Sequence, residues 1–131
     1  MKQKLFILMI DDDEDDRDLF RESVNAVDPA IECIVMEDGE SAFEYLSSGT
    51  TVPDYIFLDL SMPGYNGRKL LYNLRQSDRF KKVPVIIYTT STNEDESKEL
   101  HQLGATHFLS KPMDSKEIYY MISHVINEKW S

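Results

Sequence analysis

The amino-acid sequence predicts an α/β fold, in which helices cover a parallel β-sheet, because strand-like and helix-like segments alternate about five times along the chain. The strand-like segments are short and almost continuously apolar, which is typical of parallel strands buried on both faces. Four of them end at a polar side chain, so an acid, a hydroxyl or an amine follows each apolar run. These side chains are Asp11, Asp59, Thr89 and Lys111.

The apolar runs place five strands. The first spans about 4–10, where a run from Leu5 to Ile10 stops at Asp11, the first of six consecutive acids. The remaining strands are expected near 31–36, 54–59, 84–88 and 106–110. Because a helix-like segment separates each pair, the strands should run parallel and be joined by right-handed crossovers.

The segments between the strands are predicted to be helices, because apolar residues recur there at helical spacing. These helices span about 14–27, 40–48, 66–76, 93–103 and 115–129. Asp38 is a candidate N-cap for the second helix, and Gly49 a candidate stop. The fourth helix offers only Leu100 and Leu103 as clearly apolar residues before Gly104. A helix that buries so little should be the least anchored of the five.

Length and composition limit the possible functions. A chain of 131 residues is one domain by length, and we expect a single domain over 1–131 with no output domain attached. No apolar run approaches the ~20 residues that a membrane span needs. The net charge of −10 disfavours binding to nucleic acid or to anionic membranes. A lone cysteine, Cys33, lies in an apolar run and is expected to be buried; it fits a reducing, cytoplasmic compartment.

Polar side chains from several strand ends are expected to meet, because ligands of open parallel sheets bind at the carboxyl edge of the strands. Three carboxylates, a hydroxyl and an ammonium gathered there predict a site for a divalent cation and a phosphoryl group. The residues are Asp11, Asp12, Asp59, Thr89 and Lys111. The rest of the acidic run, from Asp13 to Asp16, is expected to be mostly solvated.

These residues and their spacing resemble the receiver domain of bacterial two-component response regulators, over essentially the whole chain. The acidic pair stands at 11–12, and residues 58–67 are similar to the phosphoacceptor loop of that family. Thr89 lies 30 residues after Asp59, and Lys111 lies 22 residues after Thr89, as in typical receivers. The resemblance implies a flavodoxin-like, doubly wound (βα)5 fold with strand order 2-1-3-4-5, which makes the first and third strands neighbours.

The resemblance also implies a function. Asp59 would accept a phosphoryl group from a histidine kinase or a histidine phosphotransfer protein and become an acyl phosphate. Lys111 would place its charge on the phosphoryl oxygens, and Thr89 would donate a hydrogen bond to one of them. The chain would act on no other substrate, so it would not be an enzyme in the usual sense.

The resemblance to receiver domains also implies a bound divalent cation. Mg²⁺, or Mn²⁺ in its place, would be ligated directly by Asp12 and Asp59, and by Asp11 mainly through water. The backbone carbonyl of Ser61 would supply a further oxygen.

The resemblance also implies that the protein passes its signal on through a surface that contacts another protein. The peptide bond before Pro112 would be cis, and Phe108 holds the position of a switch aromatic. Residues 93–124, which include Tyr119 and Tyr120, would contact a downstream protein or form a homodimer.

Two other functions remain open at this point. A phosphohydrolase of the haloacid dehalogenase type also uses an aspartyl phosphate, but its nucleophile lies on the first strand, with a second aspartate two residues later. A pseudo-receiver would bind a partner without being phosphorylated, although Asp59, Thr89 and Lys111 are all present here.

Overall fold

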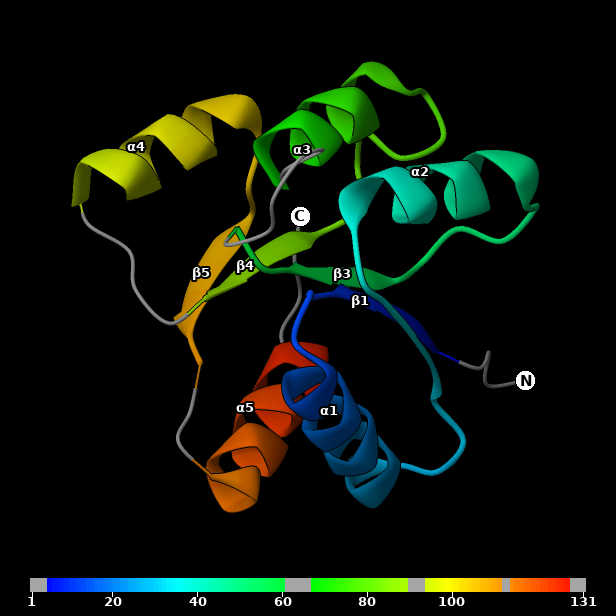
Figure 1. Ribbon diagram of the computed structural model, residues 1–131, viewed down its shortest axis with the longest axis vertical. Coiled ribbons are helices and arrows are strands. Elements are labelled where there is room, and N and C mark those ends of the chain that lie inside the picture. Colours follow the sequence, from blue (N-terminus) through cyan, green and yellow to red (C-terminus); the bar gives the residue numbers. More distant parts are fainter. Residues whose placement is uncertain (1–4, 61–66, 90–93, 112–113, 128–131) are drawn as a thin grey trace.

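The computed structural model describes residues 5–60, 67–89, 94–111 and 114–127. Its five strands form one parallel sheet in the order β2-β1-β3-β4-β5, as predicted (Figure 1). The strands are β1 (Phe6–Ile10), β2 (Glu32–Met36), β3 (Tyr55–Leu58), β4 (Val85–Thr89) and β5 (His107–Ser110). Each lies where the apolar runs placed it.

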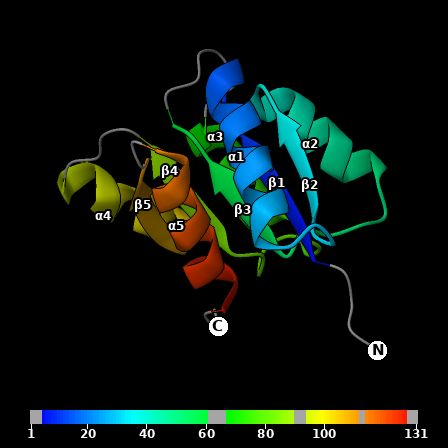
Figure 2. The same cartoon turned by 90° about the horizontal axis from the view of Figure 1, so that it is seen from below.

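Helices cover both faces of this sheet. They are α1 (Glu14–Val27), α2 (Gly39–Ser48), α3 (Gly67–Gln76), α4 (Glu94–Leu103) and α5 (Ser115–Asn127). In Figure 1, α2, α3 and α4 lie on one side of the strands, and α1 and α5 lie together on the other. The view from below shows α1 and α5 side by side across the sheet (Figure 2). None of the described helices is long and apolar enough to cross a membrane.

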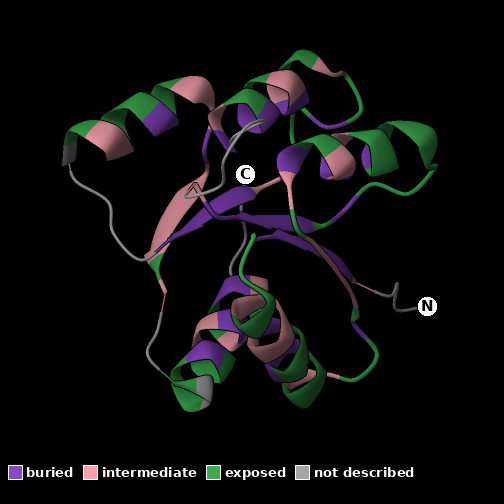
Figure 3. Ribbon diagram, viewed as in Figure 1, coloured by how far each residue is buried: buried purple, intermediate pink, exposed green. Residues whose placement is uncertain are grey.

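Neighbouring residues of a strand pack into two different hydrophobic clusters. Ile87 of β4 joins the cluster under α2, α3 and α4, whereas Ile86 joins the cluster under α1 and α5. Side chains of a strand point alternately to the two faces of a sheet, so a continuous apolar run supplies both clusters. The buried strands therefore form the middle layer of the molecule (Figure 3).

The two edge strands are less buried than the sequence predicted. Every residue of β1, β3 and β4 is buried, but β2 and β5 contain partly buried and exposed residues. Cys33 on β2 is accordingly only partly buried, and the expectation of a fully buried thiol was wrong. An edge strand has a neighbour on one side only, so apolar runs there do not imply full cover.

Helix ends follow the predicted capping residues. The side chain of Asp38 accepts a 2.7 Å hydrogen bond from the backbone N–H of Ser41, as an N-cap does. Gly49 follows α2, where its N–H donates to the carbonyl of Tyr45. Gly104 follows α4 with a φ of +110°, a conformation that other residues rarely adopt.

The fourth helix buries little, as its sequence indicated. Leu100 is fully buried, and Leu103 only packs partly against the cluster below it. Ion pairs from Arg68 on α3 to Glu96 and Glu99 add polar contacts between α3 and α4. That α4 is the most mobile helix stays a prediction.

Candidate functional site

Four strand ends bring the predicted polar residues to one edge of the sheet. Asp11 directly follows β1, and Asp59 directly follows β3, its neighbour in the sheet. The backbone N–H of Asp59 donates to the carbonyl of Ile10 at 3.0 Å, which fixes the two acids side by side. On the other half of the edge, the N–H of Lys111 donates to the carbonyl of Thr89 at 2.9 Å.

Three carboxylates form a cluster at this edge. Asp11, Asp12 and Asp59 each offer one oxygen atom, and the three atoms lie within 4.8 Å of one another. Asp11 is 0% exposed and Asp59 is 3% exposed, while Asp12 is open to solvent. The cluster is therefore buried on the protein side and accessible at Asp12.

A single ammonium group lies against these acids. Lys111 Nζ is 2.6 Å from Asp11 Oδ2 and 3.1 Å from Asp59 Oδ2. It is also 2.8 Å from Oδ2 of Asp16, a residue of α1. The lysine side chain is only 9% exposed, so these contacts are weakly screened by solvent.

The pKa values of Asp11 and Lys111 are both raised, the first by burial and the second by ion pairing. Desolvation raises the pKa of Asp11 to about 6, against the opposing effect of the nearby Lys111. Burial alone would lower the pKa of Lys111, but the close contacts of its ammonium group with the carboxylates of Asp11 and Asp16 outweigh it and raise that pKa. Lys111 is therefore protonated throughout the physiological range.

The contact between Lys111 and Asp11 is close but poorly directed. Among the described residues, Asp11 Oδ2 is a buried oxygen that accepts no hydrogen bond, even though the ammonium nitrogen is 2.6 Å away. The other oxygen, Oδ1, accepts a 2.9 Å bond from the backbone N–H of Asp13. A buried carboxylate oxygen without a hydrogen bond is costly, and a bound cation would satisfy it.

The role of Asp16 was missed by the sequence analysis. Asp13 caps α1 by accepting from the N–H of Asp16 at 3.1 Å, which places Asp16 in the first turn above the strand ends. Asp16 then accepts a hydrogen bond from Lys111, 95 residues away. The expectation that Asp13 to Asp16 are all mostly solvated was thus wrong for Asp16. The partner of Asp16 is distant in the sequence and therefore gives no local signal.

Of the remaining predicted residues, the structure describes Thr89 and Phe108. Thr89 lies at the same edge and is 2% exposed. Phe108 is partly buried on β5, and its ring packs edge-on against His101 of α4, with 4.7 Å between centroids. Ser61 and Pro112 lie outside the described residues.

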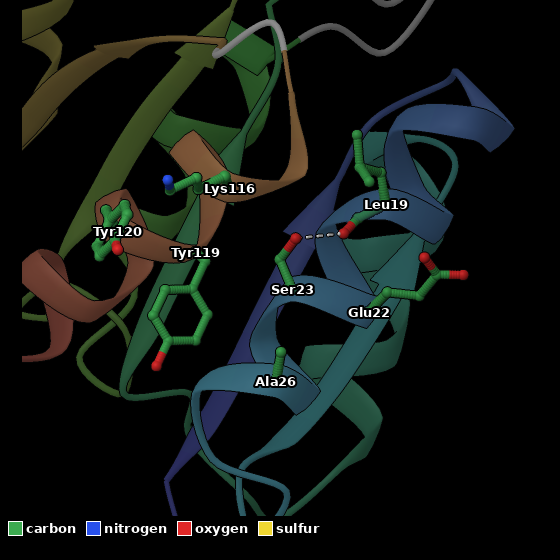
Figure 4. Close-up of a pocket in the computed structure, with 7 residues that line it drawn as sticks. All are labelled: Leu19, Glu22, Ser23, Ala26, Lys116, Tyr119 and Tyr120. Carbon is green, nitrogen blue, oxygen red and sulfur yellow. Dashed lines mark hydrogen bonds between the residues drawn. The ribbon is translucent and has the colours of Figure 1, made fainter.

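A separate pocket opens between α1 and α5, away from the acidic edge. It has a volume of about 280 Å³. Figure 4 shows Leu19, Ser23 and Ala26 on the α1 side, with Tyr119 of α5 in the gap between the helices. Tyr119 and Tyr120 are 37% and 59% exposed, and their rings meet edge-on at 5.5 Å.

Comparisons with known proteins agree with this architecture. Over 124 residues the chain is 29% identical to the response regulator Rcp1 of Synechocystis sp. (strain ATCC 27184 / PCC 6803 / Kazusa), covering 91% of this chain and 84% of Rcp1. The crystal structure of Mn²⁺-bound Rcp1 has a TM-score of 0.82 at 26% identity, covering 97% of this chain and 99% of that one. The phosphorylated cyanobacterial phytochrome response regulator RcpA shares the fold, with a TM-score of 0.85 at 24% identity over 94% of this chain and 91% of RcpA.

A family model matches most of the chain. The model describes the response regulator receiver domain, and it covers residues 7–123, from β1 into α5. Receiver domains are signalling modules rather than enzymes with a separate substrate, and they interact with histidine kinases and downstream partners. With its acidic strand ends, its lysine after β5 and its five-stranded sheet, this chain belongs to the response regulator receiver domain family.

Proposed function

We propose that this receiver takes a phosphoryl group onto Asp59 from a histidine kinase or a histidine phosphotransfer protein, with Mg²⁺ as its cation. The observation that carries the proposal is the position of Lys111 Nζ, 3.1 Å from Asp59 Oδ2 at the carboxyl edge of the sheet. There a nucleophilic carboxylate and a fixed positive charge lie together, beside two further acids. Phosphoryl transfer depends on this kind of positioning and charge stabilisation.

The proposed reaction exchanges one bond to phosphorus for another. A carboxylate oxygen of Asp59 forms a new O–P bond, while the P–N bond of a phosphohistidine donor breaks. The bonding electron pair leaves with the imidazole, which takes up a proton. Lys111 stabilises the charge that gathers on the phosphoryl oxygens, and Thr89, buried at the same edge, is proposed to donate a hydrogen bond to one of them.

The described residues fit a divalent cation. Asp11, Asp12 and Asp59 offer hard carboxylate oxygens, the ligands that Mg²⁺ and Mn²⁺ prefer, and Asp11 Oδ2 is buried without a hydrogen bond. These three side chains would hold the ion, together with the proposed backbone carbonyl of Ser61. When bound, the cation offsets negative charge on the carboxylates and on the phosphoryl oxygens. The Mn²⁺-bound form of Rcp1 supports a divalent cation in this class of protein.

The alternative functions are not favoured. The candidate nucleophile follows β3, whereas a haloacid dehalogenase-type hydrolase places it after the first strand. A module that binds without being phosphorylated would not need a lysine buried against Asp59. The family match likewise favours phosphorylation-based signalling.

We propose that output passes through residues 93–124, either to a downstream protein or to a second copy of the chain. Within this span, Phe108 contacts His101 and so connects β5 to α4, while Tyr119 and Tyr120 supply exposed aromatic surface. Such aromatic residues are enriched in protein interfaces. In this proposal the chain works as a single receiver domain in the cytoplasm, where kinases draw phosphoryl groups from ATP.

Labelling with a small phosphoryl donor tests the proposal. Acetyl phosphate with Mg²⁺ should add one phosphoryl group to the intact protein, measured by mass spectrometry, and hydroxylamine should remove it. Asp59→Asn keeps the shape of the side chain and should abolish the label, whereas Asp95→Asn, an exposed acid of α4, should keep it. Labelling of Asp59→Asn at the wild-type level would contradict the assignment.

Sedimentation tests the output surface. A beryllofluoride mimic of the phosphoryl group should increase homodimerisation or partner binding by the wild type. Tyr119→Ala with Tyr120→Ala should weaken this response, whereas Tyr72→Ala, an exposed tyrosine of α3, should not. Amide exchange changes that spare 93–124 and gather on α1 and α2 instead would place the surface elsewhere.

A further inference from the structure

The strongest feature that the proposed function does not use is the ion pair between Lys111 and Asp16. Lys111 Nζ donates a 2.8 Å hydrogen bond to Asp16 Oδ2, shorter than its 3.1 Å bond to Asp59. Asp16 lies in the first turn of α1, and its side chain is 38% exposed. The pair therefore connects the first helix of the fold to the loop after the last strand.

Hydrogen-bond direction distinguishes the three partners of the ammonium group. A lysine ammonium has three N–H donors. The bonds to Asp16 and Asp59 have hydrogen-bond geometry, whereas the contact with Asp11 does not. Directed hydrogen bonds therefore reach the lysine head from Asp16 on one side and from Asp59 on the other, while Asp11 adds a close ion pair.

Asp16 also differs from the other two partners in what else it can do. Asp11 and Asp59 both belong to the cluster of three carboxylates that can hold a cation, and Asp16 does not. Asp59 is in addition the proposed phosphoacceptor, so its oxygens are committed to phosphorus and to the ion. Among the three described carboxylates that contact Lys111, Asp16 alone has no second proposed role and can hold the lysine throughout the reaction.

We propose that Asp16 is a positioning residue, which holds the ammonium of Lys111 beside Asp59 while the phosphoryl group arrives. The inference rests on the proposed function, because it deepens the role of Lys111 in that reaction. A charge-assisted hydrogen bond gives a flexible lysine one preferred direction, and a correctly placed charge lowers the barrier to transfer. Without Asp16, the lysine head keeps its charge but loses its anchor on α1.

The sign of the effect separates positioning from simple electrostatics. Acetyl phosphate is an anion, so removing any nearby acid should speed its approach to this strongly acidic protein. If Asp16 only added negative charge, its loss would raise the labelling rate. If Asp16 positions Lys111, its loss lowers the rate.

The experiment compares Asp16→Ala with Asp15→Ala, a matched control. Asp15 is an exposed acid in the same helical turn, so the two variants lose the same charge. The rate of phosphorylation by acetyl phosphate is measured at saturating Mg²⁺. In this reaction Asp59 forms its O–P bond, the P–O bond of the donor breaks, and acetate leaves with the electron pair. We expect Asp16→Ala to be at least five-fold slower than Asp15→Ala, and Asp16→Glu to recover most of the rate.

A double-variant cycle asks whether Asp16 acts through Lys111. In a Lys111→Ala background the anchor has nothing to hold, so Asp16→Ala should match Asp15→Ala. Equal rates for Asp16→Ala and Asp15→Ala in the parent background, or an equal slowing with and without Lys111, would overturn the inference.

A measurement without phosphorylation separates this inference from the proposed function. The Nζ resonance of Lys111 is followed by NMR in metal-free protein. It should shift in Asp16→Ala and remain in place in Asp15→Ala. Failure of acetyl phosphate to label the wild type would contradict the proposed function. An Nζ resonance of Lys111 that does not shift in Asp16→Ala would contradict the positioning role alone.

Discussion

Arg68 Nε on α3 lies 2.8 Å from Oε1 of Glu99 on α4. A second nitrogen of the same guanidinium lies 3.2 Å from Glu96, so one arginine pairs with two acids on consecutive turns of α4. Among the α4 residues whose burial the structure describes, only Leu100 is fully buried, so these ion pairs supplement a small apolar contact with polar contacts to α3.

Replacing Arg68 with alanine should loosen α4 selectively. Exposed ion pairs contribute about 0–1 kcal/mol each, so the global free energy of unfolding should fall by roughly 1 kcal/mol or less. Amide exchange of Glu96 to Leu103 should nevertheless accelerate several-fold, because local opening of α4 becomes easier. Arg21→Ala, which removes an exposed pair within α1, is the control and should leave exchange in α4 unchanged.

Binding of Mg²⁺ should stabilise the fold. A ligand present at 100 times its dissociation constant adds about 2.7 kcal/mol to the free energy of unfolding. Thermal unfolding in Mg²⁺, compared with Na⁺ at matched ionic strength, measures the effect. Asp12→Ala should remove most of it, and an undiminished shift in that variant would contradict the site.

This stabilisation by Mg²⁺ should depend on pH through Asp11. Burial raises the pKa of this carboxyl to about 6, above its usual value of 3.8, so a proton competes with the cation in the folded state. In the metal-free protein, protonated Asp11 favours folding, and that contribution is lost as the pH rises through about 6. The gain from Mg²⁺ should therefore be small at pH 5 and large at pH 7.5, measured as the difference in Tm.

The thiol of Cys33 should react slowly. Burial raises its pKa to about 12, which leaves little thiolate at pH 8. Relative to an unfolded thiol of pKa about 8.5, alkylation should be slower by on the order of 10³-fold. The neutral thiol of Cys33 contributes to the free energy of unfolding below the pKa of the unfolded thiol. This contribution is lost as the pH rises toward 12. Alkylation in urea supplies the reference rate, and a fast folded thiol would refute the prediction.

Gly104→Ala should destabilise the protein more than Gly49→Ala. At Gly104 the φ is +110°, and an added Cβ would lie 2.7 Å from Cγ of Arg75. That arginine also donates a 2.9 Å hydrogen bond to the carbonyl of Gly104. A strained backbone of this kind costs about 1–3 kcal/mol, whereas Gly49 has an ordinary φ of −91°. Urea unfolding of both variants measures the difference, and equal losses would argue against strain at Gly104.

Local sequence signals predicted most of the fold. The apolar runs located every strand, because a buried parallel strand needs an apolar side chain on both faces. Asp38 identified the start of α2 because an N-cap acts within its own turn. The strand order came from the resemblance to receivers, and the sheet confirms it.

Contacts between distant residues were predicted less well. Asp16 could not be distinguished from its acidic neighbours, since its partner Lys111 depends on how α1 and β5 are placed in three dimensions. Arg75 likewise gave no signal, although it bonds to carbonyl groups in two different loops. The prediction that Cys33 is buried failed because an apolar run does not reveal which strand lies at the edge of the sheet. The polar residues at the strand ends could be predicted from the sequence, whereas the side chains that position them could not.

The packing of β4 has a consequence for how such a protein can diverge. Ile86 and Ile87 are adjacent in sequence, yet one lies under α1 and α5 and the other under α4 and its neighbours. Substitutions in the two clusters are separated by the sheet and should be close to additive. The packing under α1 and α5 and the packing under α4 should therefore be able to diverge largely independently of each other, because the sheet lies between them.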